Sequence, residues 1–114
     1  LVQHGLLAMM EAVKQEKISL EIVVEKMCHN PARLFKIEKR GFVKKGYYAD
    51  LVLIDPNKSQ TVSKENVLYK CGWSPFEGTT FHSEVTHTFV NGHLIFNNGE
   101  FNDHIKGKRL LFDR

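Results

Sequence analysis

The segment from Met27 to Asp55 constrains the fold of this chain more than any other. It holds the end of a helical pattern, an Asn30-Pro31 pair, a turn-rich stretch between Gly41 and Gly46, and a continuous apolar run. A Pro at a first helical position, preceded by a residue that can cap, predicts that one helix ends there and another begins at an angle to it. Helical patterns precede this segment and short strands follow it, which predicts an α+β fold.

Two amphipathic helices are predicted in the N-terminal third of the chain. Apolar residues recur at three- and four-residue spacing in residues 1–17, and again in residues 18–29 after Ser19, a favourable N-cap. Each stripe needs a surface to cover it, because a lone short helix is marginal in water. The residues expected to be buried are Leu6, Leu7, Met10, Val13, Leu20, Val23, Val24 and Met27.

Strands are predicted in the second half. The apolar run Leu51–Ile54 lies between turn formers, which predicts a strand buried on both faces at the centre of a sheet. Residues 84–90 alternate, and Asn91-Gly92 then asks for a two-residue type I′ turn, so a hairpin is expected there. The residue pairs expected across this hairpin are Val90 with His93 and His87 with Phe96.

The segments between these elements are less regular. Phe42 and Val43 are expected to form a very short strand, and residues 57–63 a polar loop. The loop Cys71–Gly78 is expected to pack its aromatic side chains, with a buried or half-buried thiol at Cys71. The apolar triplet Leu110–Phe112 is expected to dock onto another part of the protein.

Composition narrows the class of protein. A chain of 114 residues can form one domain with a modest core. The net charge of +3 comes from basic residues spread along the chain, which favours a solvated surface over nucleic-acid binding. Two cysteines do not make a disulfide framework, so reduced thiols in the cytoplasm are expected. No apolar run approaches the ~20 residues that span a bilayer, so no membrane partner is expected. Because the sequence starts at Leu1 and not at Met, we expect a piece of a longer chain.

The residues present do not predict a self-contained active site. Six histidines are present, but none has the spacing of a metal-binding motif, so no metal is expected to bind this segment alone. Asp50 and Asp55 flank the apolar run and could form an acid–base pair, but such residues more often cap turns at strand ends. No nucleotide-binding glycine motif and no nucleophile elbow is found.

Two blocks of sequence resemble the amidohydrolase superfamily, and most fully its dihydroorotases of the bacterial, hydantoinase-like kind. The first block is NPARLFKIEKRGFVKKGYYADLVLID. The second is YKCGWSPFEGTTFHSEVTHTFVNGHLIFNNGEF, in which SPFEG followed by VTHTFVNG is the narrower signature. The NPA and G…G…AD pattern is shared across the superfamily, including hydantoinases, allantoinases and deacetylases.

The resemblance implies a parent fold, a (β/α)8 metal-dependent hydrolase barrel with a small composite β-sandwich assembled from both chain ends. Residues 1–40 would be terminal helices packed on the barrel, residues 41–101 strands of the sandwich, and residues 102–114 a C-terminal tail. The expected partners are the remainder of that barrel and, for the parent, a small-molecule substrate, with a homo-oligomer possible.

The resemblance also implies a reaction, the reversible cyclisation of N-carbamoyl-L-aspartate to dihydroorotate in pyrimidine biosynthesis. In that family zinc holds the attacking hydroxide and an Asp takes the proton. None of those motifs matches a position here, so no catalytic or metal residue is assigned, and the segment alone is expected to be inactive. His4 is the one weak candidate for a place near the substrate, and a helix-start role competes with it. The alternatives are allantoinase, dihydropyrimidinase or hydantoinase, or a non-catalytic interaction module.

Overall fold

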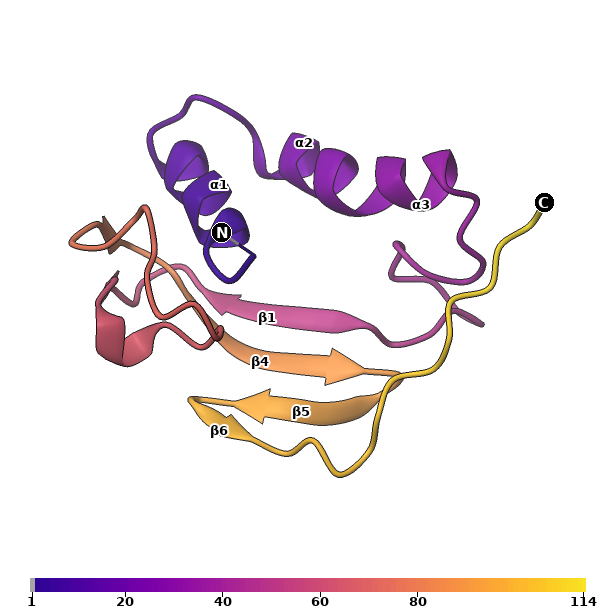
Figure 1. Ribbon diagram of the computed structural model, residues 1–114. Helices are drawn as coiled ribbons and strands as arrows, with labels where there is room; N and C mark the ends of the chain where they lie inside the picture. The colour runs from indigo at the N-terminus through magenta and orange to yellow at the C-terminus, as the bar shows by residue number, and fades with distance from the viewer. Residues whose placement is uncertain (1) are drawn as a thin grey trace. The chain divides into compact units, whose positions relative to one another are not determined.

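The computed structural model describes residues 2–114 and divides the chain into two compact units. One unit comprises the residues up to Leu20 and Ile54–Glu84, and the other comprises Glu21–Leu53 and Val85–Arg114. The helical elements are α1 (Gly5–Lys14), α2 (Leu20–Val24), the π-helical η1 (Glu25–His29), α3 (Asn30–Leu34) and the 3₁₀ turn η2 (Lys64–Asn66). The strands are β1 (Leu51–Asp55), β2 (Gln60–Thr61), β3 (Thr80–Phe81), β4 (Glu84–Val90), β5 (His93–Asn97) and β6 (Glu100–Phe101) (Figure 1). The predicted α+β class is confirmed.

The core of the first unit forms between α1 and the small antiparallel sheet of β2 and β3. Leu7 and Met10 of the predicted stripe are buried, together with Val62 and Phe81. The strand β2 lies in the segment that was expected to be a loop. Its two residues pair with partners about twenty positions away, and a pairing that short leaves no alternation in the sequence.

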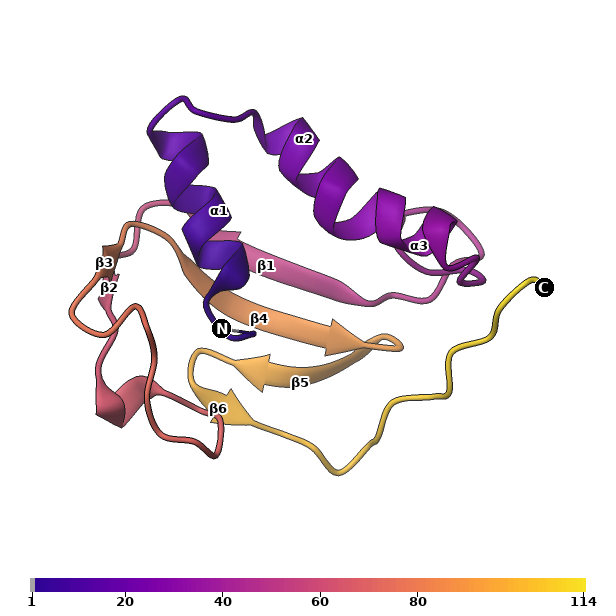
Figure 2. The same cartoon turned by 45° about the horizontal axis from the view of Figure 1, so that its top comes forward.

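In the second unit a short helix begins at Asn30-Pro31 as predicted, but the expected break before it was wrong. Val24, His29 and Asn30 all keep right-handed helical backbone angles, and α2, η1 and α3 follow one another without a turn between them (Figure 2). The amide of Asn30 bonds to the carbonyl of Glu25, five residues back. A π-helical turn of this kind gives the proline ring room that an α-helical turn would deny it.

The main sheet has four strands in the order β1-β4-β5-β6. Asn91-Gly92 forms the predicted turn, with positive φ at both residues, and Val90 pairs with His93 as expected. The expected pairing of His87 with Phe96 was wrong, because β5 carries a bulge and His87 pairs with Asn97. The extra residue is Ile95, whose carbonyl accepts the amide of Asn102.

The strand β1 corrects a second expectation. It was predicted at the centre of a sheet, but within the described residues it lies at the edge of the four-stranded sheet. The side chains of Val52 and Leu53 are 43% and 49% exposed. A continuous apolar run is typical of a strand covered on both faces, and the other residues in the described range 2–114 leave Val52 and Leu53 uncovered.

The second predicted helical stripe is only partly buried. Val23 is 2% exposed, but Leu20, Val24 and Met27 are exposed, contrary to expectation. Phe42 and Val43 form no strand, and Val43 is exposed. The tail is held by a β-bridge between Phe112 and Ile37, but the side chains of the triplet Leu110–Phe112 are exposed, so the expected docking is met by the backbone alone. No helix among residues 2–114 is both long enough and apolar enough to cross a membrane.

Candidate functional site

The largest fully buried polar side chain described in the first unit is the imidazole of His4, the residue that precedes α1. His4 is 1% exposed, and its carbonyl accepts the amide of Ala8 in the first helical turn. Three aromatic rings surround the imidazole, each with its centroid 6.2 Å away, and the ring nearest to parallel is that of Phe81. The other two rings belong to Tyr69 and Phe76. The sequence singled out His4, and the structure places it as a buried helix-start residue.

Ser74 is the hydrogen-bonding partner of this imidazole. Its Oγ lies 3.3 Å from His4 Nδ1 and accepts the amide of Phe76 at 3.1 Å. Because Ser74 Oγ accepts the amide hydrogen of Phe76, its own hydroxyl hydrogen can be donated to His4 Nδ1, which must then carry no proton. Burial lowers the pKa of His4 below its usual value of 6.5. Both observations indicate a neutral imidazole.

Lowering the pKa of His4 predicts a pH dependence of stability. Below pH ~6.5 the unfolded chain binds a proton that the folded chain excludes, so the free energy of unfolding falls as the pH falls, by up to ~1.4 kcal/mol per pH unit. We expect His4→Gln to flatten this slope between pH 7 and pH 5. Urea denaturation of the intact protein across that range measures it. Equal slopes in both proteins would contradict the assignment.

Gln3 holds the neighbouring loop and was missed by sequence reasoning. Its side-chain amide donates to the carbonyl of Asn66 at 2.8 Å and accepts the amide of Leu68 at 2.8 Å. Together Gln3 and His4 fix two points of the segment 66–76 to the start of α1. Nothing in the local sequence signals these contacts, which span more than sixty residues. For Ser74 the Ser-Pro pair was an available turn signal.

The other candidate ligands are dispersed. His29 stacks on Phe42 at 4.2 Å between centroids, His82 Nδ1 lies 2.7 Å from a carboxylate oxygen of Glu11, and His87 contacts its own neighbour Thr86. Within residues 2–114 no three His, Cys, Asp or Glu side chains lie close enough together to hold a metal ion. The described residues therefore do not fit a metal centre.

The loop Cys71–Gly78 is more open than predicted. Cys71 and Cys28 are both exposed free thiols, so the expected burial of Cys71 was wrong. Trp73 is 60% exposed, whereas Phe76 packs edge-on against Phe81 with 5.4 Å between ring centroids. Gly72, the residue before Trp73, has a positive φ, which glycine adopts without strain.

A polar cluster organises the second unit around Asp50. One carboxylate oxygen pairs with the guanidinium of Arg40, which is 8% exposed, and the other accepts the amide of Asn91 at 2.8 Å. The Arg40 guanidinium also lies over the ring of Tyr48. Asp55 accepts the amide of Asn57 at 2.9 Å. Both aspartates thus bond to turns beside the strands, as the sequence predicted, and they do not form an acid–base pair.

Comparison with known proteins assigns the chain to a family. The model of the amidohydrolase family matches residues 1–95. The chain belongs to the amidohydrolase family. Among curated family members, a dihydroorotase of Pyrococcus furiosus is 33% identical over 103 residues, which cover 90% of this chain and 25% of that protein. A dihydroorotase of Carboxydothermus hydrogenoformans is 43% identical over 86 residues, covering 75% of this chain and 20% of that protein.

Solved structures of the family agree with this assignment. An L-hydantoinase (dihydropyrimidinase) from Arthrobacter aurescens matches with a TM-score of 0.73 at 32% identity, over 82% of this chain and 21% of that chain. A dihydropyrimidinase from Brevibacillus agri matches with a TM-score of 0.71 at 33% identity, over 80% and 20% of the two chains. The amidohydrolase segment described here thus spans a fifth to a quarter of the length of the family members it matches.

Proposed function

We propose that this chain is the C-terminal portion of a dihydroorotase, which hydrolyses the cyclic amide bond of dihydroorotate and reverses that reaction by cyclising N-carbamoyl-L-aspartate in pyrimidine biosynthesis. The observation that carries the proposal is the alignment of 90% of the chain with a dihydroorotase at 33% identity. The parent is a (β/α)8 barrel with a composite β-sandwich. In this chain Cys28 and Cys71 are exposed free thiols, which supports a cytoplasmic location for the protein.

In this proposal the segment supports the parent fold and does not carry the chemistry. Val24 and Met27 on the helix, and Val52 and Leu53 on β1, each keep more than a third of their surface exposed. Burying apolar surface contributes about 25 cal/mol per Å², so these faces gain stability only when another surface covers them. We assign that role to the remainder of the parent barrel.

The proposed division of labour follows the expected boundaries. Residues 1–40 pack on the barrel, residues 41–101 complete the sandwich, and residues 102–114 form the tail. Zinc belongs to the parent, because the described residues of this segment offer no cluster of ligands for it. His4 is enclosed by aromatic rings and bonded to Ser74, which supports a positioning role at the start of α1 and no contact with substrate.

A second candidate function is the hydrolysis of hydantoins or dihydropyrimidines. The solved structures favour it, because the matching chains carry the names hydantoinase and dihydropyrimidinase. Both candidates open a cyclic amide, so they differ in the substrate and not in the class of reaction.

The test is a substrate comparison with the intact protein. Ring opening of dihydroorotate is measured by chromatography of the product, N-carbamoyl-aspartate. We expect its kcat/KM to exceed that for dihydrouracil and for hydantoin by at least about tenfold, which corresponds to ~1.4 kcal/mol of transition-state stabilisation. The 114-residue segment alone is expected to show no turnover. A preference for hydantoin would select the second candidate, and the absence of all three activities would favour a non-catalytic interaction module.

A further inference from the structure

The positive charge of this protein is concentrated in two segments that are distant in sequence. Residues 33–45 contain six basic residues and one acidic residue, and residues 106–114 contain four basic residues and one acidic residue. These short segments carry ten of the sixteen lysine and arginine residues, and both belong to the second unit. The interpretation that basic residues are spread along the chain is therefore corrected, because most of them fall in these two segments.

Backbone hydrogen bonds join the two basic segments side by side. The amide of Glu38 bonds to the carbonyl of Leu111, and the amide of Asp113 bonds to the carbonyl of Lys36, each at 2.9 Å. The β-bridge between Ile37 and Phe112 lies between them. This pairing brings together cationic side chains that are about seventy residues apart in the chain.

Two clefts of about 510 Å³ each open at this junction. Arg33, Lys36, Lys39 and Arg40 line the first cleft, and Arg109 and Arg114 line the second. Glu38 belongs to both, so the clefts are adjacent. Their volumes fall in the range of about 300–1,000 Å³ that small-molecule sites occupy.

Most of these cations have no ionic partner. Over residues 2–114, Arg40 pairs with Asp50 and Lys106 with Asp103, but no carboxylate lies within 4 Å of the charged nitrogens of Arg33, Lys36, Lys39, Arg109 or Arg114. Arg40 also keeps one buried nitrogen, Nη2, without a hydrogen-bond partner. Basic residues in a last helical turn complement the helix dipole, but Lys39, Arg109 and Arg114 lie outside that turn.

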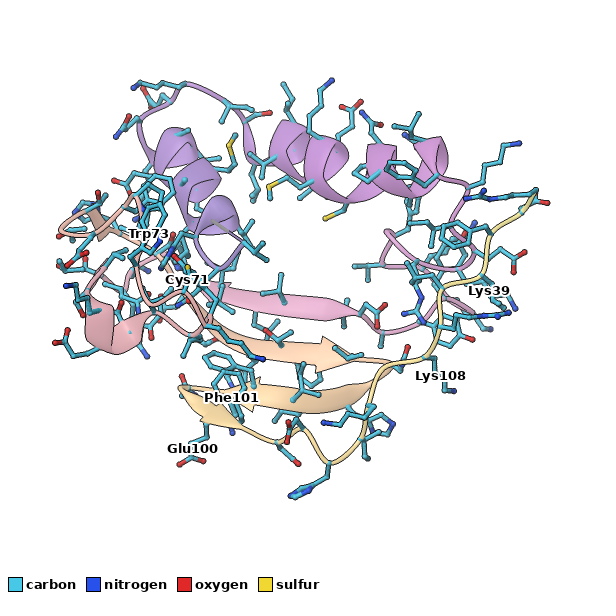
Figure 3. All side chains as sticks on the ribbon, in the orientation of Figure 1. Lys39, Cys71, Trp73, Glu100, Phe101 and Lys108 are labelled. Carbon is cyan, nitrogen blue, oxygen red and sulfur yellow. The ribbon has the colours of Figure 1, made fainter. Side chains whose placement is uncertain are left out.

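Two cations of the second unit lie near one aromatic ring, that of Tyr48. The guanidinium carbon of Arg40 lies 4.2 Å from the centroid of the Tyr48 ring, and Nζ of Lys108 lies 5.7 Å from the same centroid. Figure 3 shows Lys39 and Lys108 toward the same end of the second unit. Two cations beside one ring repel each other, and a bound anion would relieve that repulsion.

We propose that the adjacent clefts bind a small molecule that carries two or more phosphate groups. Arginine forks match phosphate oxygens in pairs, and lysines add point charges around them. Two concave clefts of this volume fit a compact ligand. The site is separate from the chemistry of the proposed function and does not depend on it.

The test is calorimetric titration of the intact protein with inorganic tripolyphosphate at low salt. We expect saturable binding that weakens as salt is raised, because the interaction is ionic. The test variant is Lys36→Asn with Lys39→Asn. Both lysines have φ of 53°, a left-handed conformation that asparagine tolerates well, so the double variant removes two charges with little strain. We expect its affinity to fall by at least about tenfold.

The matched control is Lys58→Asn with Lys70→Asn, two exposed lysines of the first unit. It changes the net charge equally and is expected to alter the affinity less than twofold. No binding to the wild-type protein, or equal losses in the two double variants, would overturn the proposal. Tighter binding of a short DNA duplex than of tripolyphosphate, sensitive to the same two lysines, would replace the small ligand with nucleic acid. Because no turnover is measured, none of these outcomes depends on the dihydroorotase assignment.

Discussion

Gly41→Ala is expected to destabilise the protein by about 2–5 kcal/mol. A Cβ at this position would lie 2.5 Å from the Cβ of Ala32 and 2.8 Å from the carbonyl oxygen of Cys28. Both atoms belong to the helix formed by η1 and α3, and neither is the end of a flexible side chain. The backbone φ of +81° adds a further cost for any residue with a Cβ. Urea denaturation of the intact protein measures the change.

Gly46→Ala separates the two causes. Gly46 has nearly the same φ, +84°, but a Cβ there would meet nothing within 4 Å. Only the backbone cost applies, so we expect a loss of about 1–2 kcal/mol. If Gly41→Ala and Gly46→Ala lower the free energy of unfolding equally, the contact of the added Cβ with the helix at Gly41 makes no contribution to the loss.

Asp50→Asn is expected to cost about 2–3 kcal/mol of stability. Asparagine keeps an oxygen for the amide of Asn91 but removes the charge that faces Arg40. The Arg40 side chain is 9% exposed and would be left as an unpaired buried cation. Because Asp50 itself is one-third exposed, water compensates for part of the loss. Thermal and urea denaturation of the intact protein give the magnitude.

Asp103→Asn is the matched control for the loss of an ion pair. Asp103 pairs with Lys106 at 3.3 Å, but both side chains are more than three-quarters exposed. Exposed pairs contribute little, so we expect a change within about 0.5 kcal/mol. Equal effects of the two substitutions would show that the burial of Arg40 does not amplify the interaction.

Local signals in the sequence predicted the elements of the fold that depend on neighbouring residues. The turn at Asn91-Gly92 needs positive φ at both residues, and Asn followed by Gly is the pair that adopts such angles most readily. The buried face of α1 could be predicted because three- and four-residue spacing places Leu7 and Met10 on one side of the helix.

Features that depend on distant residues were not predictable in this way. The bulge at Ile95 is set by how β5 fits β4, and the pairing of β2 with β3 by contacts across the first unit. The burial of Val52 and Leu53 was predicted from a continuous apolar run, but the strand order that puts β1 at a sheet edge cannot be read from the run itself. At the candidate site, His4 was noticed, but its partner Ser74 lies seventy residues away.

The π-helical turn before Pro31 has a consequence for how the helix presents its side chains. Val23 and Ala32 are both buried, yet nine residues separate them, which in a regular α-helix would set them ~180° apart. The turn absorbs one extra residue, so the two positions differ by only ~80°. The one added residue thus changes the angular position of the later side chains around the helix axis, and both apolar residues lie on the same side of the helix. Deleting one residue from Glu25–His29 would remove the extra residue that the turn absorbs, so a regular α-helix would then hold the two positions at the same ~80°, whereas inserting a residue elsewhere in the segment would rotate them apart.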